Sequence, residues 1–178
     1  GTLGTGSPAS AYESWARGAD PSITKVAVLT NLDLLRPGRV DVIIAGDGGG
    51  LGAGVILAAQ NAIAPMSFGG SKIPETAEAV VSTAANVTVI VQGIVYVRSS
   101  YNTAAFQALI AADLLELQRA IPIGGLVAWE RILGAVQNRA GTGVGVITNL
   151  DWVSPVVDIQ LTYAQVAVLS LSLTYVSV

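Results

Sequence analysis

Two residue types are missing from this chain of 178 residues, which contains no cysteine and no histidine. Without cysteine the chain can form no disulfide, and it has no thiolate for nucleophilic chemistry or metal binding. Without histidine it lacks the commonest general base and the commonest zinc ligand. Both absences argue against an enzyme, so we expect no catalytic residues, no cofactor and no metal site.

Charged side chains are also scarce. They make up 12% of the residues, about half of the usual share of roughly 25%, whereas 52% of the residues are hydrophobic. A free monomer of this composition would expose apolar patches, so we expect a subunit that covers part of its surface with neighbouring protein chains. The Lys and Arg residues are scattered and the net charge is −3, which argues against nucleic acid as a partner.

Long apolar runs are missing as well. The most apolar stretch, residues 163–178, is interrupted by Gln165, Ser170, Ser172 and Thr174, so no segment has the roughly 18 consecutive apolar residues that indicate a membrane-spanning helix. The first ten residues have neither the basic start nor the apolar run of a signal peptide. We therefore expect no membrane span.

The first half of the chain alternates short strand patterns with helix patterns. Two strands, at 23–30 and 39–45, are separated by a loop and predict an antiparallel hairpin. The alternation of Val87, Val89 and Val91 predicts a long, twisted strand with a bulge at Gly93. The other expected elements are a helix over 7–18, a glycine-rich loop over 46–50, a helix over 52–64, an irregular segment over 66–74 and an ambiguous element over 75–81.

Two helical segments organise the second half. The first, residues 103–120, carries Phe106, Ile110, Leu114 and Leu117 along one seam. The second carries an apolar stripe that begins at Trp129. We expect Trp129 to lie in the core. After them we expect a strand over 144–147, a turn over 149–155 and alternating strands over 157–161 and 169–175.

The order of these elements predicts the α+β class, with two small lobes of mixed, mainly antiparallel sheet packed with helices. The boundary is expected near residues 98–101, which gives a central lobe over 1–98 and a C-terminal lobe of a helix pair and strands over 99–178.

The helix over 103–120 is the first candidate for an assembly surface, because its apolar residues extend over more than half of its circumference. Leu109 and Leu115 lie off the main seam. Asp113 lies at the edge of the apolar face, where a carboxylate needs a partner, in the same chain or in another subunit. Trp152 and Val153, in the expected turn, complete the predicted interface.

A nucleotide-binding enzyme is an alternative. Gly48, Gly50 and Ala53 match the pattern G-x-G-x-x-A between a strand and a helix, as in dinucleotide-binding turns. Against it, the strand before the loop is expected to pair as a hairpin and not to open a βαβ unit. Residues 67–72 also contain no acid for a ribose. Glu75 and Glu78 could pair as catalytic carboxylates but are more typical of solvated surface charge. A standalone protein-binding module is a third possibility.

The order and spacing of several motifs resemble the baseplate J-like proteins, the wedge subunits of contractile phage tails and related injection particles. The resemblance covers nearly the whole chain, although no single motif is diagnostic. Its N-terminal part comprises Gly4-Thr5-Gly6-Ser7-Pro8, Tyr12, Trp15-Ala16, the 21–28 strand and Gly38-Arg39-Val40-Asp41-Val42. Its C-terminal part comprises Ile121-Pro122-Ile123-Gly124-Gly125, the helix with Ile132, the 143–147 strand, the 149–155 turn and Gln165-Val166-Ala167-Val168-Leu169.

The resemblance implies a structural role without catalytic residues. It implies that copies pair within a wedge, that wedges close into a ring around the tail hub, and that the ring passes the baseplate rearrangement to the sheath. The expected location is the tail baseplate of a virion or injection particle assembled in the bacterial cytoplasm. Family members also carry a further N-terminal region.

Overall fold

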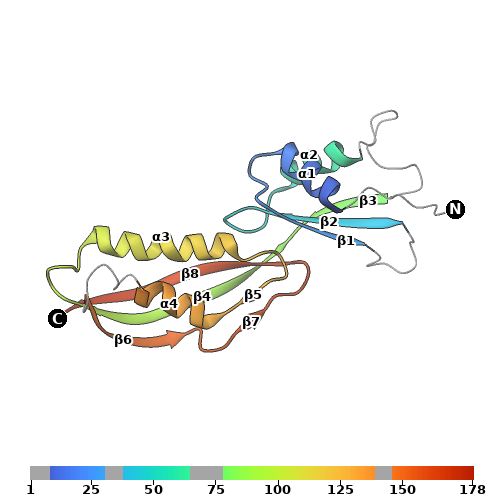
Figure 1. The fold of residues 1–178 in the computed structure, drawn as a ribbon. Coiled ribbons are helices and arrows are strands. Elements are labelled where there is room, and N and C mark those ends of the chain that lie inside the picture. The colour runs from blue at the N-terminus through green and yellow to red at the C-terminus, as the bar shows by residue number, and fades with distance from the viewer. Residues whose placement is uncertain (1–8, 31–37, 65–77, 139–145) are drawn as a thin grey trace. The chain divides into compact units, whose positions relative to one another are not determined.

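The computed structural model describes residues 9–30, 38–64, 78–138 and 146–178 (Figure 1). Helices and strands occur in both halves of the chain. In chain order they are α1 (Ala9–Ala19), β1 (Lys25–Thr30), β2 (Arg39–Ala45), α2 (Ala53–Ile63), β3 (Glu78–Thr83), β4 (Ala85–Val97), α3 (Ala104–Ala120), β5 (Leu126–Val127), α4 (Trp129–Asn138), β6 (Ile147–Ser154), β7 (Ile159–Gln160) and β8 (Gln165–Ser177).

Residue contacts divide the chain into two compact units. Unit 1 contains residues 1–86 together with two short later segments, 122–124 and 162–166. Unit 2 contains residues 87–121, 125–161 and 167–178. The expected division into folding domains at residues 98–99 stays a prediction, for which the Discussion gives a test.

The sheet of unit 1 has the order β1-β2-β3. β1 pairs with β2 in an antiparallel hairpin, as the sequence predicted, with Lys25 opposite Ala45 and Thr30 opposite Val40. Helices α1 and α2 pack on one face of this sheet, where alternate residues of β2 are buried. The buried residues of this core are Tyr12, Ala16, Ile23, Val40, Val42, Ile44, Ala59, Ile63, Ala79 and Val81.

The ambiguous element over 75–81 is a strand from Glu78 onward, and β3 runs parallel to β2. Strands β2 and β3 are therefore joined through α2 as a βαβ unit. This corrects the argument that the strand before the glycine-rich loop opens no such unit, because β2 pairs with β1 on one edge and with β3 on the other. Period-2 patterns do not distinguish parallel from antiparallel neighbours, since both place alternate side chains on one face.

The second face of this sheet is covered by the later segments of unit 1. Ile43 and Ala45 of β2 form a small cluster with Ala84 and with Val166, which lies more than a hundred residues further along the chain. Ile123, from the connector between α3 and β5, packs against the same cluster. The connector turns at Gly124, whose φ is +70°, and the Gly124 N–H donates to the Gln165 carbonyl at 2.9 Å. Glycine suits this position, because other residues rarely adopt a positive φ.

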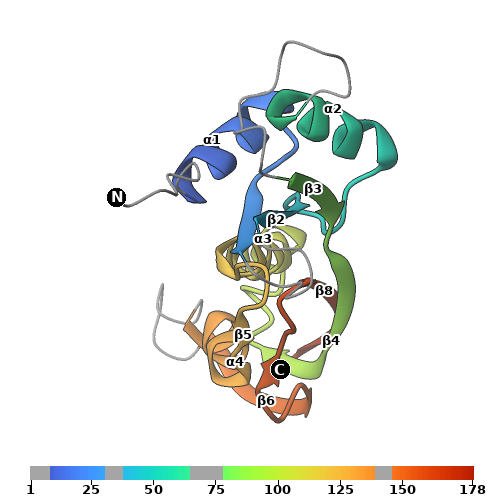
Figure 2. The same cartoon turned by 90° about the vertical axis from the view of Figure 1, so that its right-hand side faces the viewer.

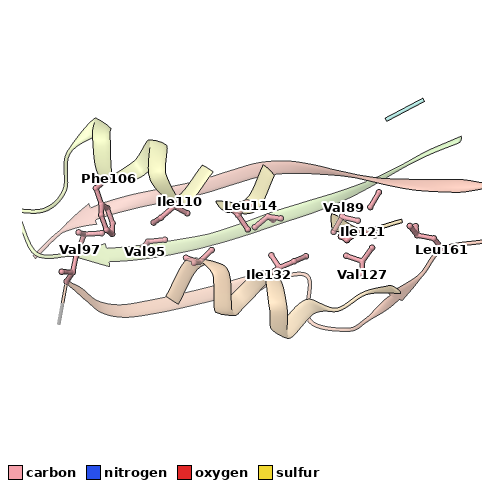
Figure 3. Packing of buried hydrophobic residues seen from close by; sticks show 14 residues of the cluster. Val89, Val95, Val97, Phe106, Ile110, Leu114, Ile121, Val127, Ile132 and Leu161 are labelled. Carbon is pink, nitrogen blue, oxygen red and sulfur yellow. The ribbon is translucent and has the colours of Figure 1, made fainter. Parts of the chain in front are cut away.

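The sheet of unit 2 has the order β6-β4-β8. Strands β4 and β6 are antiparallel, whereas β8 runs in the same direction as β4 (Figure 1). Figure 2 shows α3 and α4 on one side of this sheet. The core lies between these helices and the sheet (Figure 3). Its buried members are Val89, Val91, Val95, Val97, Phe106, Ile110, Leu114, Ile121, Val127, Ile132, Val136, Val146, Leu161 and Ala167.

The register between β4 and β6 shifts at Gly93, where the sequence predicted a bulge. A Cβ atom at Gly93 would lie 3.0 Å from the Asp151 carbonyl oxygen, so the close approach of the two strands accounts for the glycine.

The turn expected over 149–155 is wrong, because β6 runs from Ile147 to Ser154 and pairs with β4. Asn149 and Asp151, which favour turns locally, lie opposite Tyr96 and Ile94. Asp151 accepts a hydrogen bond from the Tyr96 hydroxyl at 3.0 Å. Tertiary pairing thus overrides the local turn preference. Of the strand expected over 144–147, only residues 146 and 147 lie within the described ranges.

The α+β class and the mixed sheets are confirmed. Within the described ranges, no helix combines the length and apolar character needed to cross a membrane. The irregular segment expected over 66–74 lies outside the described residues.

Candidate assembly surface

Helix α3 begins where its sequence predicts. The Thr103 hydroxyl oxygen accepts a hydrogen bond from the Phe106 N–H at 3.2 Å, as an N-cap residue does. Phe106, Ile110 and Leu114 of the predicted seam are buried, and Leu117 is half-buried against the core. The next buried position is the polar Gln118, whose side-chain oxygen accepts a hydrogen bond from the Leu169 N–H of β8 at 2.6 Å.

The opposite side of α3 is apolar and exposed. With about 3.6 residues per turn, five of its exposed apolar side chains fall on one side of the helix. We call this set the α3 stripe: Ala105, Ala108, Leu109, Ala112 and Leu115. Leu109 is 46% exposed and Leu115 is 42% exposed. The described part of the chain therefore covers only one side of α3, and the apolar stripe on the opposite side remains exposed.

The two leucines lie at the two borders of the stripe, with Ala112 between them. Alanine side chains allow another backbone to approach closely, and the flanking leucines add apolar area for contact. No charged residue lies within the stripe; Glu116 and Arg119 follow it in the last turns of the helix. Exposed apolar surface of this kind is typical of sites that bind other proteins.

Asp113 lies apart from the stripe, in a groove of about 660 Å³ between α3 and α4. Its side chain is half-buried and has an interaction partner within the structure. The groove also contains Glu116, Glu130 and Arg131. The expectation that this carboxylate does not stand alone is met, whereas its role at a subunit contact stays a prediction.

Trp152 and Val153 lie on β6 and not in a turn. Trp152 packs against the core, and its indole N–H donates to the Pro155 carbonyl at 2.6 Å. Val153 is 54% exposed. It lies at the register shift, where Gly93 pairs with Trp152 and Gln92 pairs with Ser154, so Val153 has no residue opposite it in β4. Of this pair, only Val153 offers substantial exposed apolar surface.

The expectation that Trp129 lies in the core is wrong. Trp129 is half-buried at the start of α4 and does not belong to the buried clusters found within the described ranges. Its backbone N–H donates to the Asp158 carboxylate at 3.0 Å, so a residue far along the chain caps α4. Sequence reasoning missed this cap, because N-cap signals are sought next to the helix.

The glycine-rich loop is held by its own chain. The Gly50 N–H donates to the Asn86 side-chain oxygen at 2.7 Å, and the Leu51 N–H donates to the Thr83 hydroxyl at 2.7 Å. In a dinucleotide-binding turn, such backbone donors face the pyrophosphate. A Cβ atom at Gly50 would lie 2.6 Å from the Ala84 carbonyl oxygen, so close packing explains this glycine without a ligand.

The remaining acidic candidates do not form a pair in the described ranges. Glu78 is exposed at the start of β3, in register with Arg39, and Glu75 lies outside the described residues. Within the described ranges, no group of three or more Asp or Glu side chains is placed to hold a metal ion. Asp41 is buried and accepts hydrogen bonds from the Arg39 guanidinium, at 2.7 Å for the shorter one.

The structure thus brings together two of the five predicted interface residues, Leu109 and Leu115, on one helix side. Ala105 and Ala108 were not recognised as part of this surface, although their spacing along the helix could have shown them.

Comparisons with known proteins agree with the resemblance drawn from the motifs. Residues 4–90 match the family model of the Baseplate J-like central domain. A chain in the cryo-EM structure of the anti-feeding prophage (AFP) baseplate, 6-fold symmetrised, has a similar fold, with a TM-score of 0.50 and 12% sequence identity. That match covers 92% of this chain and 37% of the other chain. A search of curated proteins finds no match. Over residues 4–90, this chain is therefore similar to the Baseplate J-like central domain.

Proposed function

We propose that this chain is a structural wedge component of the baseplate of a contractile tail or injection machine. In this role it assembles with copies of itself and with other baseplate proteins into a ring around the hub, and it couples baseplate rearrangement to sheath contraction. The observation that carries the proposal is the match of residues 4–90 to the Baseplate J-like central domain. The family supports a non-enzymatic role, and assembly in the bacterial cytoplasm completes the proposal.

The α3 stripe supports the assembly part of this role. A subunit that works alone is expected to cover or charge such a surface, since contiguous exposed apolar area promotes association. We assign the stripe to contacts with neighbouring baseplate subunits, and Asp113, Trp152 and Val153 to secondary contacts. Val153 offers the most exposed surface of the three, because it is 54% exposed whereas Asp113 and Trp152 are half-buried.

Substitution within the stripe tests the proposal. Leu109→Asp and Leu115→Asp place a charge on the surface that the neighbouring subunits would cover, so particle assembly is expected to fall while the isolated chain still folds. The matched control is Leu57→Asp, because Leu57 is also an exposed leucine on a helix, at 55%. Particle yield by electron microscopy and chain folding by circular dichroism are the two measurements. Normal particles from both stripe variants would contradict the assignment of the stripe.

The nucleotide-binding alternative has a separate test. Titration calorimetry with common dinucleotides is expected to give no binding heat, because the Gly50 and Leu51 N–H groups already donate within the chain. Heat that disappears when Gly48 is replaced by a bulkier residue would favour the enzyme. A standalone binding module would be indicated if the chain were absent from purified particles.

A further inference from the structure

β8 is an edge strand of unusual character. It is 13 residues long and contains no charged residue, proline or glycine. Sheets usually protect exposed edges with short strands, charges, prolines or bulges, because unpaired backbone groups at an edge can pair with another chain. In the described part of the chain, β8 pairs with β4 on one side, and no strand pairs with its other side.

The other edge strands of the two three-stranded sheets have the usual protection. β6, at the opposite edge of the same sheet, is 8 residues long, carries Asp151 and has two register irregularities. In unit 1 the edge strands β1 and β3 are each 6 residues long and carry Lys25 and Glu78. β8 is therefore the exception among the four edges of these two three-stranded sheets.

Two hydrogen bonds determine which backbone groups of β8 face outward. The Ala85 N–H donates to the Ala164 carbonyl at one end, and the Val178 N–H donates to the Val97 carbonyl at the other. Backbone groups alternate between the two sides of a strand. The even-numbered residues of β8 thus bond toward β4, and the odd-numbered residues face the open edge. The Leu169 N–H confirms this, since it points away from β4 to Gln118.

Gln118 closes the edge at Leu169, so the free part of the edge begins after it. The outward-facing residues beyond this point are Leu171, Leu173, Tyr175 and Ser177. Leu171 is 43% exposed, although its side chain lies on the helix-bearing side of the sheet with Leu173 and Tyr175.

We infer that two copies of this chain pair through the free edge of β8, antiparallel and related by a two-fold axis at Thr174. This register uses every free outward-facing residue, because Leu171 lies opposite Ser177 and Leu173 opposite Tyr175 of the other copy. A two-fold interface requires a self-complementary strand. The uncharged strand meets that requirement, since it brings no like charges together and places Thr174 beside its own copy and leucine beside tyrosine, both favourable cross-strand pairs.

Charge substitution at the axis tests the register. Thr174→Lys puts two ammonium groups side by side, and Thr174→Glu puts two carboxylates there. Each variant is expected to raise the dimer dissociation constant about five-fold or more at low salt, and an equimolar mixture of the two is expected to restore pairing. Thr88→Lys is the matched control, because Thr88 is also exposed on this sheet but lies on the central strand β4. Analytical ultracentrifugation of the full chain gives the dissociation constants.

Amide hydrogen exchange measured by NMR gives an independent readout. The N–H groups of Leu171, Leu173 and Tyr175 are expected to exchange more slowly as protein concentration rises. Those of Ser172 and Thr174 are expected to be slow at every concentration, since they bond to β4. A monomeric wild-type chain overturns the inference, and so does a dimer that Thr174→Lys leaves unchanged. The inference does not rest on the baseplate role: dimerisation lost in Leu109→Asp but retained in Thr174→Lys would assign the contact to the α3 stripe instead.

Discussion

Single residues show where the packing leaves no room. A methyl group at Gly50 would meet the Ala84 carbonyl oxygen at 2.6 Å, so Gly50→Ala is expected to lower the free energy of unfolding by about 1–3 kcal/mol. Gly54, in the first turn of α2, has nothing within 4 Å of the equivalent position, and Gly54→Ala is expected to stabilise the chain by about 0.5–1 kcal/mol. Urea unfolding of both variants checks the opposite signs. Equal effects would show that the loop tolerates a side chain.

Burial makes Ile132 the residue of α4 that matters most for stability. Ile132 is fully buried in the core of unit 2, so Ile132→Ala is expected to cost about 2–5 kcal/mol of unfolding free energy. Leu109→Ala is the matched control, because it also truncates a large aliphatic side chain on a helix but at an exposed position, where about 0.5 kcal/mol is typical. Denaturant unfolding measures both. A cost at Ile132 no larger than at Leu109 would contradict the described core.

Tyr12 links stability to alkaline pH. Burial raises the pKa of its hydroxyl above the ordinary value of about 10, because the folded chain disfavours the phenolate. Its contribution is complete below about pH 10 and is lost as pH rises through the folded pKa. Lys25 acts in the opposite direction, since burial lowers its pKa. Tyr12→Phe removes only the first effect, so unfolding free energy should fall less steeply above about pH 10 than in the wild type. Identical slopes in denaturant titrations would argue against this role of Tyr12.

Among the elements, α3 shows how far local signals reach. Its start, its end and its buried seam follow from residues within the helix, which is why sequence reasoning located them. The cap at Thr103 carries a specific expectation. Thr103→Ala removes the acceptor for the Phe106 N–H and should cost about 1 kcal/mol of unfolding free energy. Thr103→Ser keeps a hydroxyl and should cost much less, which thermal or urea unfolding would resolve; equal losses would mean that the methyl group matters and the cap does not.

β6 shows where local signals fail. Residues 149–155 contain Asn, Asp, Ser and Pro, a composition typical of turns. The neighbouring strand β4 decides otherwise, because its backbone supplies partners for this segment and its register places Asn149 and Asp151 beside Tyr96 and Ile94. The same dependence on a distant partner explains the missed α4 cap at Asp158.

At the scale of the whole molecule, the late segments 122–124 and 162–166 belong to unit 1 and cover one face of its sheet. A fragment of residues 1–98 lacks both, so it should expose the cluster around Ile43 and Ala45. We expect this fragment to bind the dye ANS and to be less stable than unit 1 in the full chain, because apolar area returns to water. A fragment that folds as stably as the full chain, with equal amide protection in β2, would instead support the predicted domain boundary at residues 98–99.

The sequence by itself determined the α+β class, the β1–β2 hairpin, the bulge at Gly93 and the two main helices, because each depends on residues that are close in the chain or on a period that side chains alone express. It also indicated an assembled protein through its shortage of charge, and it indicated Leu109 and Leu115 as surface. Only the tertiary structure decided the parallel pairing of β3 and the strand at residues 147–154. It also decided that the alanines of the α3 stripe are exposed and that one edge of β8 is open. Those features depend on which distant backbone lies alongside, and periodicity within a segment carries no information about its neighbours.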